Sequence, residues 1–580
     1  MDVLGISAYY HDSSACLLRD GKIIAAAQEE RFSRKKHDLG FPVNAMNYCL
    51  EEAKTAAKEL DAVAFYEKPY LKFERLLMQF IDTFPRSMGV FVESIPSWLS
   101  EKLLVPKNIK DLGYNGKVYY LEHHLSHAAS AFLCSPYKKA AILTVDGVGE
   151  YATTTFSSGN DREIKLFKEI HFPHSLGLLY STITAYLGFT VNNSEYKVMG
   201  LAPCGKPVYM DEFDKLIKNF DDGSFELDMS HFAYTHEKKM PSKKLEQLFG
   251  EKTREKESQI TQFHKDVAAS LQAKTEEVLF HLLENLYKET KLENLCMAGG
   301  VALNSVANGK ILSKTPFKRI FIQPAAGDAG TSMGAALFVY NSLMKKRREF
   351  VLTSAFLGPS FSDQKVKEYL DKNAIKYSRF RSQAEIAKKT AELVHNNSVI
   401  GWFEGRMEWG PRALGARSIL SNPTNPKMQD ILNLKVKHRE KFRPFAPVVL
   451  FEEAHKWFEC DDPIPEAADY MLMVYPVRKE KRKIIPAVTH VDGSGRLQVI
   501  RKEQHALYYQ AVKEFQKLSG VPIMINTSFN IRGEPIVCTP HDAYRCMMGT
   551  GIDCLVIENY LVKRSDNQKD MWDSEKNATD

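Results

Sequence analysis

Two segments of the sequence repeat the same order of strands and turns, and this repeat constrains the fold more than any other feature. In residues 3–27, three apolar runs are separated by a polar loop at 11–14 and an Asp-Gly hairpin signal. Residues 140–170 repeat this order, with Asp-Gly-Val-Gly-Glu at 146–150 as the loop and Gly-Asn-Asp as the turn. The repeat predicts a duplicated α/β architecture with one polar loop in each half.

Beyond the repeat, apolar spacing predicts further helices and strands. The strongest predicted helix covers 260–290, where large apolar residues recur at helical spacing. A Leu-Gly-Pro-Ser sequence at 357–360 indicates a domain boundary, after which helices and strands alternate. We therefore predict one domain at 1–357, an α+β domain at 358–565, and a polar, disordered tail at 566–580. The other predicted elements are helices at 43–59 and 383–395 and strands at 62–65, 295–298 and 399–403.

The bulk properties narrow the class of protein. A chain of 580 residues exceeds one hydrophobic core. A net charge of +6 is too mild to predict nucleic-acid binding, but it suits an anionic small-molecule substrate. None of the nine cysteines forms a Cys-x-x-Cys pair, which disfavours a zinc ribbon. With no signal-peptide pattern and no apolar run near 18 residues, we expect a cytoplasmic protein without membrane contact.

Two histidines and two aspartates form a candidate metal site. His123 and His127 stand four residues apart, so on a helix they share one face. Asp146 ends an apolar strand, and Asp328 lies between small residues in Ala-Gly-Asp-Ala-Gly. A lone histidine is more often structural, but this set favours a metal. Imidazoles with carboxylates and without cysteine suit Fe(II), with Mn(II) or Zn(II) next.

Glycine turns and arginine-rich segments indicate anion binding. Turns at 146–150, 299–300 and 327–330 leave backbone N–H groups free for phosphate, although no P-loop or dinucleotide fingerprint occurs. Arginines at 405–443 lie among Gly, Pro and aromatic residues, and others follow at 496 and 532. Planar guanidinium groups match phosphate oxygens in two contacts. We therefore favour a pocket for a multiply charged phosphate over a solvated or nucleic-acid-binding face.

At these motifs the chain resembles the O-carbamoyltransferases of the NodU/TobZ family, nearly from end to end. The motifs lie at fixed places along the chain and are specific when taken together. They are Ile-Ser-Ala-Tyr-Tyr-His-Asp-Ser-Ser at 6–14, Gln-Glu-Glu-Arg-Phe-Ser-Arg-Lys-Lys-His-Asp at 28–38, His-His-Leu-Ser-His-Ala at 123–128, Glu-Tyr-Lys-Val-Met-Gly-Leu-Ala-Pro at 195–203, Gly-Gly-Val-Ala-Leu-Asn at 299–304, Gly-Pro-Arg-Ala-Leu-Gly at 410–415 and Asn-Thr-Ser-Phe-Asn at 526–530.

The resemblance implies an N-terminal domain like the tRNA threonylcarbamoyl transferase TsaD, of the actin/heat-shock chaperone/sugar-kinase class, and a YrdC-like C-terminal domain. It implies that the C-terminal domain makes carbamoyl adenylate from carbamoyl phosphate and ATP, with Mg(II), and that the N-terminal domain transfers the carbamoyl group. The acceptor would be a hydroxyl of a small molecule, such as a natural product or sugar. No nucleic-acid or membrane partner is implied, and a homodimer stays open.

The resemblance also assigns roles to residues of this sequence. His123, His127, Asp146 and Asp328 would bind iron, and His11 and Lys36, which residue type alone would place on the surface, would serve the transfer site. One departure is Cys204, where relatives commonly carry tyrosine. The nucleotide or carbamoyl adenylate in the N-terminal domain would contact Gly147, Gly149, Glu150, Lys197, Gly299, Gly300 and Asn304. Carbamoyl phosphate and ATP in the C-terminal domain would contact Arg412, Arg417, Arg439, Arg443, Arg496, Ser528 and Arg532.

Three other functions compete on the same scaffold. A tRNA threonylcarbamoyladenosine-type enzyme normally divides the two domains between proteins, and the weak net charge argues against a tRNA surface. A sugar kinase would release ADP and would leave the histidine–aspartate set unexplained. An ATPase of the heat-shock chaperone type would turn over ATP without carbamoyl phosphate. The shared motifs concern the donor, so the sequence does not predict the acceptor.

Overall fold

The computed structural model describes residues 1–567 as two compact units. Unit 1 contains Met1–Glu29 and His37–Leu352; unit 2 contains Glu30–Lys36 and the chain from Thr353 onward. The units therefore divide at 352/353, whereas the sequence predicts a domain boundary at 357/358, and a short N-terminal segment belongs to unit 2. Apart from its first two residues, the predicted tail lies outside the described residues.

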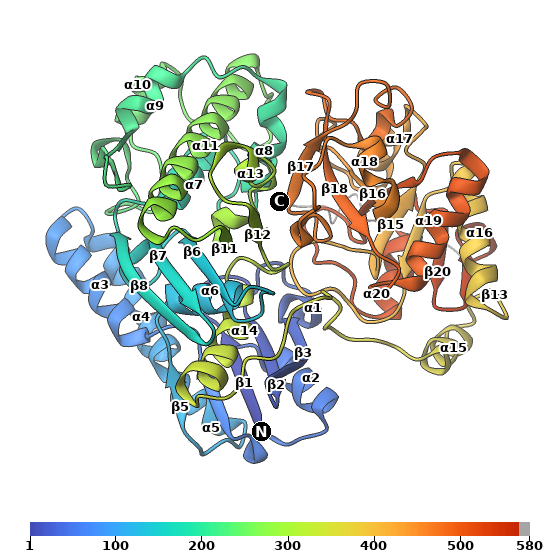
Figure 1. The fold of residues 1–580 in the computed structure, drawn as a ribbon, viewed down its shortest axis with the longest axis horizontal. Coiled ribbons are helices and arrows are strands. Elements are labelled where there is room, and N and C mark those ends of the chain that lie inside the picture. The colour runs from blue at the N-terminus through green and yellow to red at the C-terminus, as the bar shows by residue number, and fades with distance from the viewer. Residues whose placement is uncertain (568–580) are drawn as a thin grey trace. The chain divides into compact units, whose positions relative to one another are not determined.

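Unit 1 is built from two five-stranded sheets with the same topology (Figure 1). The first has the order β3-β2-β1-β4-β5, and the second has the order β8-β7-β6-β11-β12. In each sheet the first three strands along the chain pair antiparallel, and two later strands add parallel to the first. The duplication predicted from the repeat is confirmed, and it includes the parallel strands that the repeat did not cover.

The bounds of unit 1 follow. Its strands are β1 (Asp2–Ser7), β2 (Ser14–Arg19), β3 (Lys22–Gln28), β4 (Ala62–Phe65), β5 (Val118–Tyr120), β6 (Lys139–Val145), β7 (Ala152–Asn160), β8 (Glu163–His171), β9 (Ile217–Asn219), β10 (Phe225–Leu227), β11 (Asn294–Ala298) and β12 (Arg319–Phe321). Its helices are α2 (Val43–Ala53), α3 (Pro69–Thr83), α4 (Met88–Ser100), α5 (Val105–Asp111), α6 (His123–Phe132), α7 (Leu176–Tyr186), α8 (Glu195–Leu201), α9 (Met210–Leu216), α10 (Lys243–Phe249), α11 (Gln262–Thr290), α12 (Ser305–Asn308), α13 (Ile311–Lys314) and α14 (Ala329–Leu337).

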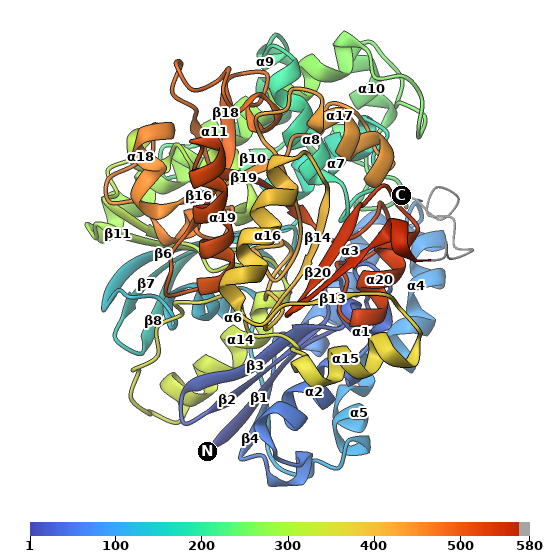
Figure 2. The same ribbon diagram turned by 90° about the vertical axis from the view of Figure 1, so that its right-hand side faces the viewer.

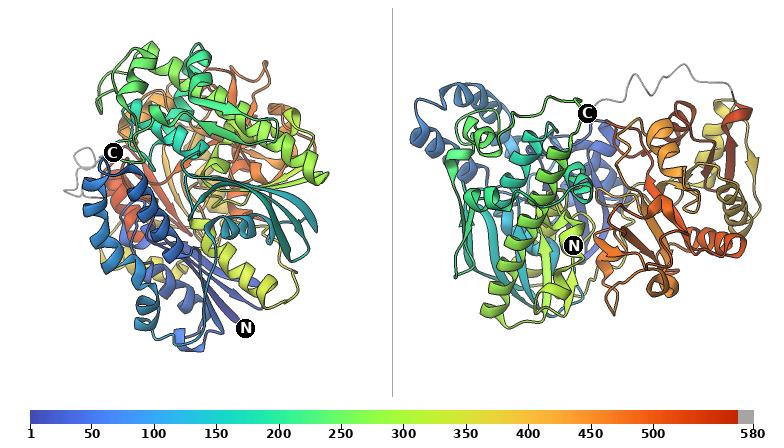
Figure 3. Two further views of the ribbon diagram at one scale, coloured as in Figure 1. Left: turned by 90° about the vertical axis from the view of Figure 1, so that its left-hand side faces the viewer. Right: turned by 90° about the horizontal axis from the view of Figure 1, so that it is seen from above.

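Two helices, α6 and α14, connect the halves of unit 1. Helix α6 follows the last strand of the first sheet and packs on the second, whereas α14 follows the last strand of the second and packs on the first. The two helices pack against each other, and Figure 3 shows the two sheets, in blue and teal, from another side. A Cβ atom on Gly334 would lie 1.9 Å from the Ser126 carbonyl oxygen. Only glycine therefore permits this approach of the two backbones.

The long predicted helix at 260–290 is confirmed as α11, and the predicted strand at 62–65 is confirmed as β4. The predicted helix at 43–59 is wrong in its second half. Helix α2 ends at Ala53 because Lys54 takes a left-handed conformation, with φ of 51°, and its N–H donates back to the Glu51 and Leu50 carbonyls. A single turn of 3₁₀ helix, Ala57–Glu59, follows.

Unit 2 contains a nine-stranded sheet of order β13-β21-β20-β14-β15-β19-β16-β18-β17. Helices α16 and α19 pack side by side (Figure 2). The strands are β13 (Ser378–Arg379), β14 (Ile400–Phe403), β15 (Arg417–Ser421), β16 (Ala446–Leu450), β17 (Met473–Pro476), β18 (Ser494–Ile500), β19 (Ile523–Ser528), β20 (Cys554–Ile557) and β21 (Tyr560–Lys563). The helices are α1 (Glu30–Ser33), α15 (Asp363–Lys372), α16 (Gln383–His395), α17 (Met428–Ile431), α18 (Ala454–Trp457), α19 (Ala506–Ser519) and α20 (Pro540–Met548).

The segment Glu30–Lys36 is attached to the rest of unit 2 by two arginines. Arg31 Nη2 donates to the Gly410 carbonyl at 2.9 Å, and Arg34 donates to the carbonyls of Ile536 and Pro535 at 2.7 and 2.9 Å. These bonds to backbone oxygens explain why a segment from the N-terminal part of the chain belongs to this unit. In the described part of the chain, no helix is long and apolar enough to cross a membrane.

The contact between α6 and α14 gives a first prediction. Gly334→Ala is expected to destabilise unit 1 by about 3 kcal/mol, because the new methyl group overlaps a helix backbone that cannot move without disturbing both sheets. Urea unfolding followed by circular dichroism measures this. Gly89→Ala is the control, since nothing lies within 4 Å of a Cβ there, and it should be neutral or slightly stabilising. Equal stability of both variants would contradict the prediction.

Candidate metal centre and candidate phosphate site

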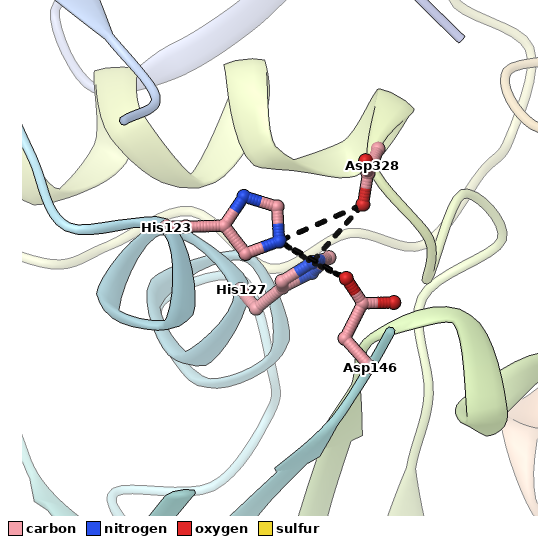
Figure 4. A group of neighbouring side chains, drawn as sticks. All are labelled: His123, His127, Asp146 and Asp328. Carbon is pink, nitrogen blue, oxygen red and sulfur yellow. Dashed lines mark hydrogen bonds and ion pairs between the residues drawn. The ribbon is translucent and has the colours of Figure 1, made fainter. Parts of the chain in front are cut away.

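The metal ligands predicted from the sequence come together in unit 1, at the junction of its two halves (Figure 4). His123 and His127 lie on the first turns of α6, Asp146 follows the last residue of β6, and Asp328 immediately precedes α14. The four side chains are buried and point toward one another. The helix spacing and the strand end thus lead to one site.

The four side chains are close enough to bind one ion. One ligand atom from each lies within 4.8 Å of the other three. His123 Nε2 is 3.1 Å from Asp146 Oδ2, and His127 Nε2 is 3.4 Å from Asp328 Oδ1. The two Nε2 atoms are 3.1 Å apart. Both imidazoles are fully buried, and both carboxylates are nearly so.

The chemistry of this set fits a divalent cation. Within residues 1–567, neither carboxylate oxygen of Asp328 has a hydrogen-bond partner, and an unpaired buried carboxylate is costly. Burial lowers the pKa of His127, but the Asp146 and Asp328 carboxylates outweigh it and raise the pKa to about 9. Two nitrogens and two carboxylates are ligands that Fe(II), Mn(II) and Zn(II) accept. A bound cation would take the place of the proton that these carboxylates stabilise on His127.

Glycine turns border these four side chains. The Gly300 N–H donates to Asp146 Oδ1 at 2.7 Å, which leaves Oδ2 toward the histidines. Gly299 has a φ of +96°, and a Cβ there would lie 2.2 Å from the Val145 carbonyl oxygen. A Cβ on Gly149 would lie 3.0 Å from His123 Cβ, whereas Gly147 has ordinary room. Three of the four predicted glycines thus serve the metal ligands by close backbone approach; their contact with a nucleotide stays a prediction.

The other predicted nucleotide residues of unit 1 have protein partners. Glu150 accepts from the backbone N–H groups of Lys68, at 2.7 Å, and His123, at 3.0 Å, so it holds the start of α6. Asn304 caps α12 and exchanges hydrogen bonds with Gln272. Lys197 is buried, with its ammonium 5.7 Å from the Phe189 ring centroid. Glu150 and Asn304 therefore have structural roles in this structure.

His11 adjoins the metal ligands and belongs to a network that sequence reasoning did not find. Its Nε2 is 3.6 Å from Asp328 Oδ2, and its Nδ1 bonds to Asp12 Oδ2 at 3.0 Å. Asp12 also binds His37 Nδ1 at 2.8 Å, and His37 Nε2 lies 3.0 Å from Asn193 Oδ1. Burial raises the pKa of Asp12, but the two imidazoles outweigh it and hold that pKa well below its usual range. The only sequence signal was the His-Asp pair at 11–12.

Lys36 does not share the unit of His11, because the segment that carries it belongs to unit 2. There it lies near a buried lysine, Lys437, which sequence reasoning also missed. The Lys437 ammonium donates to the Ser528 carbonyl and to the Asn530 carbonyl and side-chain oxygens. Burial and repulsion from Arg439, Arg443 and Lys36 hold the pKa of Lys437 well below its usual range. The only sequence feature that could have indicated Lys437 is its position in the basic segment Lys-Val-Lys-His-Arg.

These residues form the candidate phosphate site of unit 2, which we define as Lys36, Lys437, Arg439, Arg443 and Ser528. Arg439 Nε donates to Asn433 at 2.7 Å, and Ser528 Oγ donates to Asn530 Oδ1 at 2.7 Å. Three cationic side chains around the Lys437 amine form a strong site for an anion. An anion bound there would raise the pKa of Lys437 and so favour its charged form, which is the form that binds phosphate.

Arg417, one of the predicted phosphate ligands, bonds extensively to the protein itself. Its side chain is fully buried, and its guanidinium donates to the carbonyls of Glu404, Gly405, Ala416 and Pro359. It also stacks 3.5 Å from the Phe403 ring centroid. Nη1 and Nη2 of Arg417 thus hold the surrounding backbone, whereas Nε has no hydrogen-bond partner among the described residues, and contact with a phosphate stays a prediction. Arg412, Arg496 and Arg532 are half-buried, and their contact with a phosphate stays a prediction.

A buried carboxyl–imidazole pair lies beside the Arg417 loop. Glu404 Oε2 is 3.0 Å from His505 Nε2. Burial and the Glu558 charge raise the pKa of Glu404 to about 7, and burial lowers the pKa of His505 to about 4. Near pH 6 both groups are therefore neutral, and the protonated carboxyl can donate to the imidazole.

This pair gives a prediction with a defined sign. Because folding raises the pKa of Glu404, this group's contribution to the stability of the wild type is lost as the pH rises from about 4.5 to about 7. Glu404→Gln keeps a neutral donor and removes that loss. We expect the variant to gain about 2 kcal/mol relative to wild type between about pH 5 and about pH 8, measured by urea unfolding of unit 2. A difference that does not change with pH would contradict the assignment.

The metal centre gives a third prediction. His127→Ala should weaken binding of Mn(II) or anaerobic Fe(II) at least about 100-fold, measured by isothermal titration calorimetry, because one of four ligands is lost. The control is His171→Ala, since that histidine is exposed and outside the set. Unchanged affinity in His127→Ala would place the metal elsewhere.

Comparisons with known proteins agree with this division of the chain. A family model described as "Carbamoyltransferase N-terminus" matches residues 2–337, and one described as "Carbamoyltransferase C-terminus" matches residues 391–564. An uncharacterized protein of Synechocystis sp. is 47% identical over 97% of each chain. Nodulation protein NolNO of Sinorhizobium fredii is 38% identical over 98% of this chain and 81% of that protein.

Among solved structures, HypF of T. kodakarensis shares 11% identity over 60% of this chain and 48% of that chain, with a TM-score of 0.33, which is too low to support an inference. The family models together cover most of the sequence; the second falls in unit 2, and the first falls in unit 1 except for the segment Glu30–Lys36. The chain belongs to the carbamoyltransferase family and is a carbamoyltransferase enzyme.

Proposed function

We propose that the protein is an ATP-dependent O-carbamoyltransferase that makes carbamoyl adenylate in unit 2 and transfers the carbamoyl group in unit 1 to a hydroxyl of a small molecule. The first reaction would consume carbamoyl phosphate, ATP and one water, and would release phosphate and pyrophosphate. In the second, the acceptor oxygen would form a bond to the carbamoyl carbon while the bond to AMP breaks. AMP would leave, and no covalent intermediate with the enzyme is needed.

The candidate phosphate site supports the first reaction. Both substrates carry several negative charges, and Lys437 and its three cationic neighbours would bind them by charge-assisted hydrogen bonds. The same charges would stabilise pyrophosphate as it leaves. Arg417 would also hold the surrounding backbone, through its contacts with the carbonyls of Pro359, Glu404, Gly405 and Ala416. With Mg(II) on ATP, the remaining phosphate charge would match this cluster.

The centre formed by His123, His127, Asp146 and Asp328 supports the second reaction. A bound Fe(II), or Mn(II) or Zn(II), would supply Lewis acidity and neutralise the two carboxylates. His11, held at Nδ1 by Asp12, would accept the proton of the acceptor hydroxyl at Nε2. Burial lowers the pKa of His11, but the carboxylates of Asp328 and Asp12 outweigh it and raise the pKa to about 10. Neutralising Asp328 would therefore free this imidazole to act as a base.

The observation that carries the proposal is that one carbamoyltransferase chain contains two separate charged sites of opposite character. Unit 1 holds a buried site of two imidazoles and two carboxylates, and unit 2 holds a site of cations. A sugar kinase on the same scaffold would need neither the metal ligands nor the second site. The two sites together fit activation of a donor followed by its transfer.

The test separates the two reactions by their products. Wild type with ATP, carbamoyl phosphate and a panel of alcohols should release pyrophosphate and AMP and give a carbamoylated alcohol, followed by mass spectrometry. Lys437→Met should lower pyrophosphate release at least about 100-fold, because it removes a buried phosphate ligand. His127→Ala should keep pyrophosphate release and lose the carbamoylated product.

Lys435→Met is the matched control for Lys437→Met, since Lys435 is exposed two residues away, and it should keep both reactions. ADP as the nucleotide product would favour the sugar kinase instead. Incorporation of the carbamoyl group into tRNA would favour the RNA-modifying function. Pyrophosphate release that does not depend on carbamoyl phosphate would refute the proposed donor.

A further inference from the structure

Exposed apolar side chains are concentrated on one helical hairpin of unit 1, formed by α3, the turn 84–87 and α4. Of the nineteen large apolar side chains that are exposed among the described residues, seven lie between 70 and 99. Six of them are on the two helices, and Phe84 is in the turn. Their exposed fractions run from 46% for Met88 to 70% for Tyr70. Single exposed apolar residues are ordinary, but a cluster of this size indicates an interaction surface.

Each helix presents its exposed apolar residues on one face. At about 100° per residue, Tyr70, Met78 and Ile81 of α3 lie within about 80° of one another around the helix axis. Met88, Val92 and Leu99 of α4 lie within about 40°. These two groups are not the faces by which the helices contact each other.

The helices contact each other through a separate set of rings. The centroids of Phe80 and Phe91 are 4.0 Å apart, and those of Phe73 and Trp98 are 5.7 Å apart. Residues later in α3 thus pair with residues earlier in α4, so the two helices run antiparallel. On both helices the ring positions repeat every seven residues, as in helix pairs of bundles.

This geometry places both exposed groups on the same side of the hairpin. On each helix the exposed apolar residues are rotated from the ring contacts by roughly a quarter turn in the same sense along the chain. Because the helices are antiparallel, equal rotations in the chain direction turn both groups toward the same side. We call this surface the apolar hairpin face: Tyr70, Met78, Ile81, Met88, Val92 and Leu99.

The size of the face matches what a dimer requires. At about half exposure, each large apolar side chain presents on the order of 100 Å², so the six residues and Phe84 supply on the order of 700 Å². A stable protein–protein interface buries about 800 Å² per partner. The face of one copy therefore suffices, with its rim, for a standard interface.

The exposed charges near the face favour a second copy over a lipid surface. Arg86 lies in the turn and is exposed, Glu74 is exposed between Tyr70 and Met78 on the same face of α3, and Glu101 is exposed at the open end of the hairpin. Asp82 and Glu93 are exposed nearer the turn, so carboxylates outnumber cations around the face. In a two-fold antiparallel arrangement, Arg86 of one copy approaches the glutamates of the other. A helix that binds anionic lipid instead carries an excess of Lys and Arg on its polar side.

We propose that two copies of this chain associate through the apolar hairpin face, so that α3 and α4 of each copy form a four-helix bundle around a two-fold axis. The contact is isologous, and each residue of the face therefore contributes twice. The surface lies outside both candidate sites, so this association goes beyond the proposed function and does not depend on it.

The test is the oligomeric state of the full-length protein between about 1 and about 100 µM, measured by sedimentation equilibrium. Wild type should be a dimer, and Ile81→Glu and Val92→Glu should raise the dissociation constant at least about 100-fold, since each places two carboxylates in an apolar contact. Val491→Glu is the matched control, because Val491 is 78% exposed in unit 2, and it should leave the dimer intact.

Circular dichroism and thermal unfolding of each variant verify that the fold is kept. A wild type that stays monomeric at the highest concentration would overturn the proposal. A dimer that survives the double substitution Ile81→Glu with Val92→Glu would overturn it as well. A monomer that sediments with phosphatidylglycerol vesicles, and loses this binding in Ile81→Glu, would assign the face to lipid instead.

Discussion

The structure of unit 1 depends on the close packing of α6 against α14. These helices come from opposite halves of a duplicated fold, and each leaves one sheet to pack on the other. The absence of a side chain at Gly334 permits the contact, and it brings the first turns of α6 toward the start of α14. His123, His127 and Asp328 are therefore positioned by the same packing that joins the two halves. A change that separated the helices would disturb the fold and the metal centre together.

The two candidate sites differ in how burial acts on charge. In unit 1, the buried carboxylates of Asp146 and Asp328 raise the pKa of His127, and a metal ion bound to the set would take the place of that proton. In unit 2, burial and like charges act on Lys437 in the same direction and reduce its proton affinity. That cluster gains stability when an anion arrives. One chain thus contains a candidate site for a metal ion and a candidate site for phosphates, which is the division that the two proposed reactions would require.

Much of the fold could be predicted from local pattern. The strands of the repeat and the long helix α11 follow from apolar spacing, which depends on neighbouring residues alone. The predicted helix at 43–59 is wrong after Ala53, because Lys54 takes a left-handed conformation and ends the helix. A lysine in the sequence does not predict that conformation. The allocation of Glu30–Lys36 to unit 2 could not be predicted either. It depends on Arg31 and Arg34 meeting backbone carbonyls far along the chain.

The sequence by itself determined the candidate metal ligands, because helical spacing puts His123 and His127 on one face and a buried strand ends at Asp146. It also determined that arginines gather in the second half of the chain. Only the tertiary structure decided which protein groups these cations meet. Arg417 is buried among carbonyl oxygens, Lys437 is buried near Arg439 and Arg443, and Lys36 belongs to another unit than His11. The physical reason is that the residue type determines what a side chain can bind, whereas long-range packing determines which protein groups lie next to it.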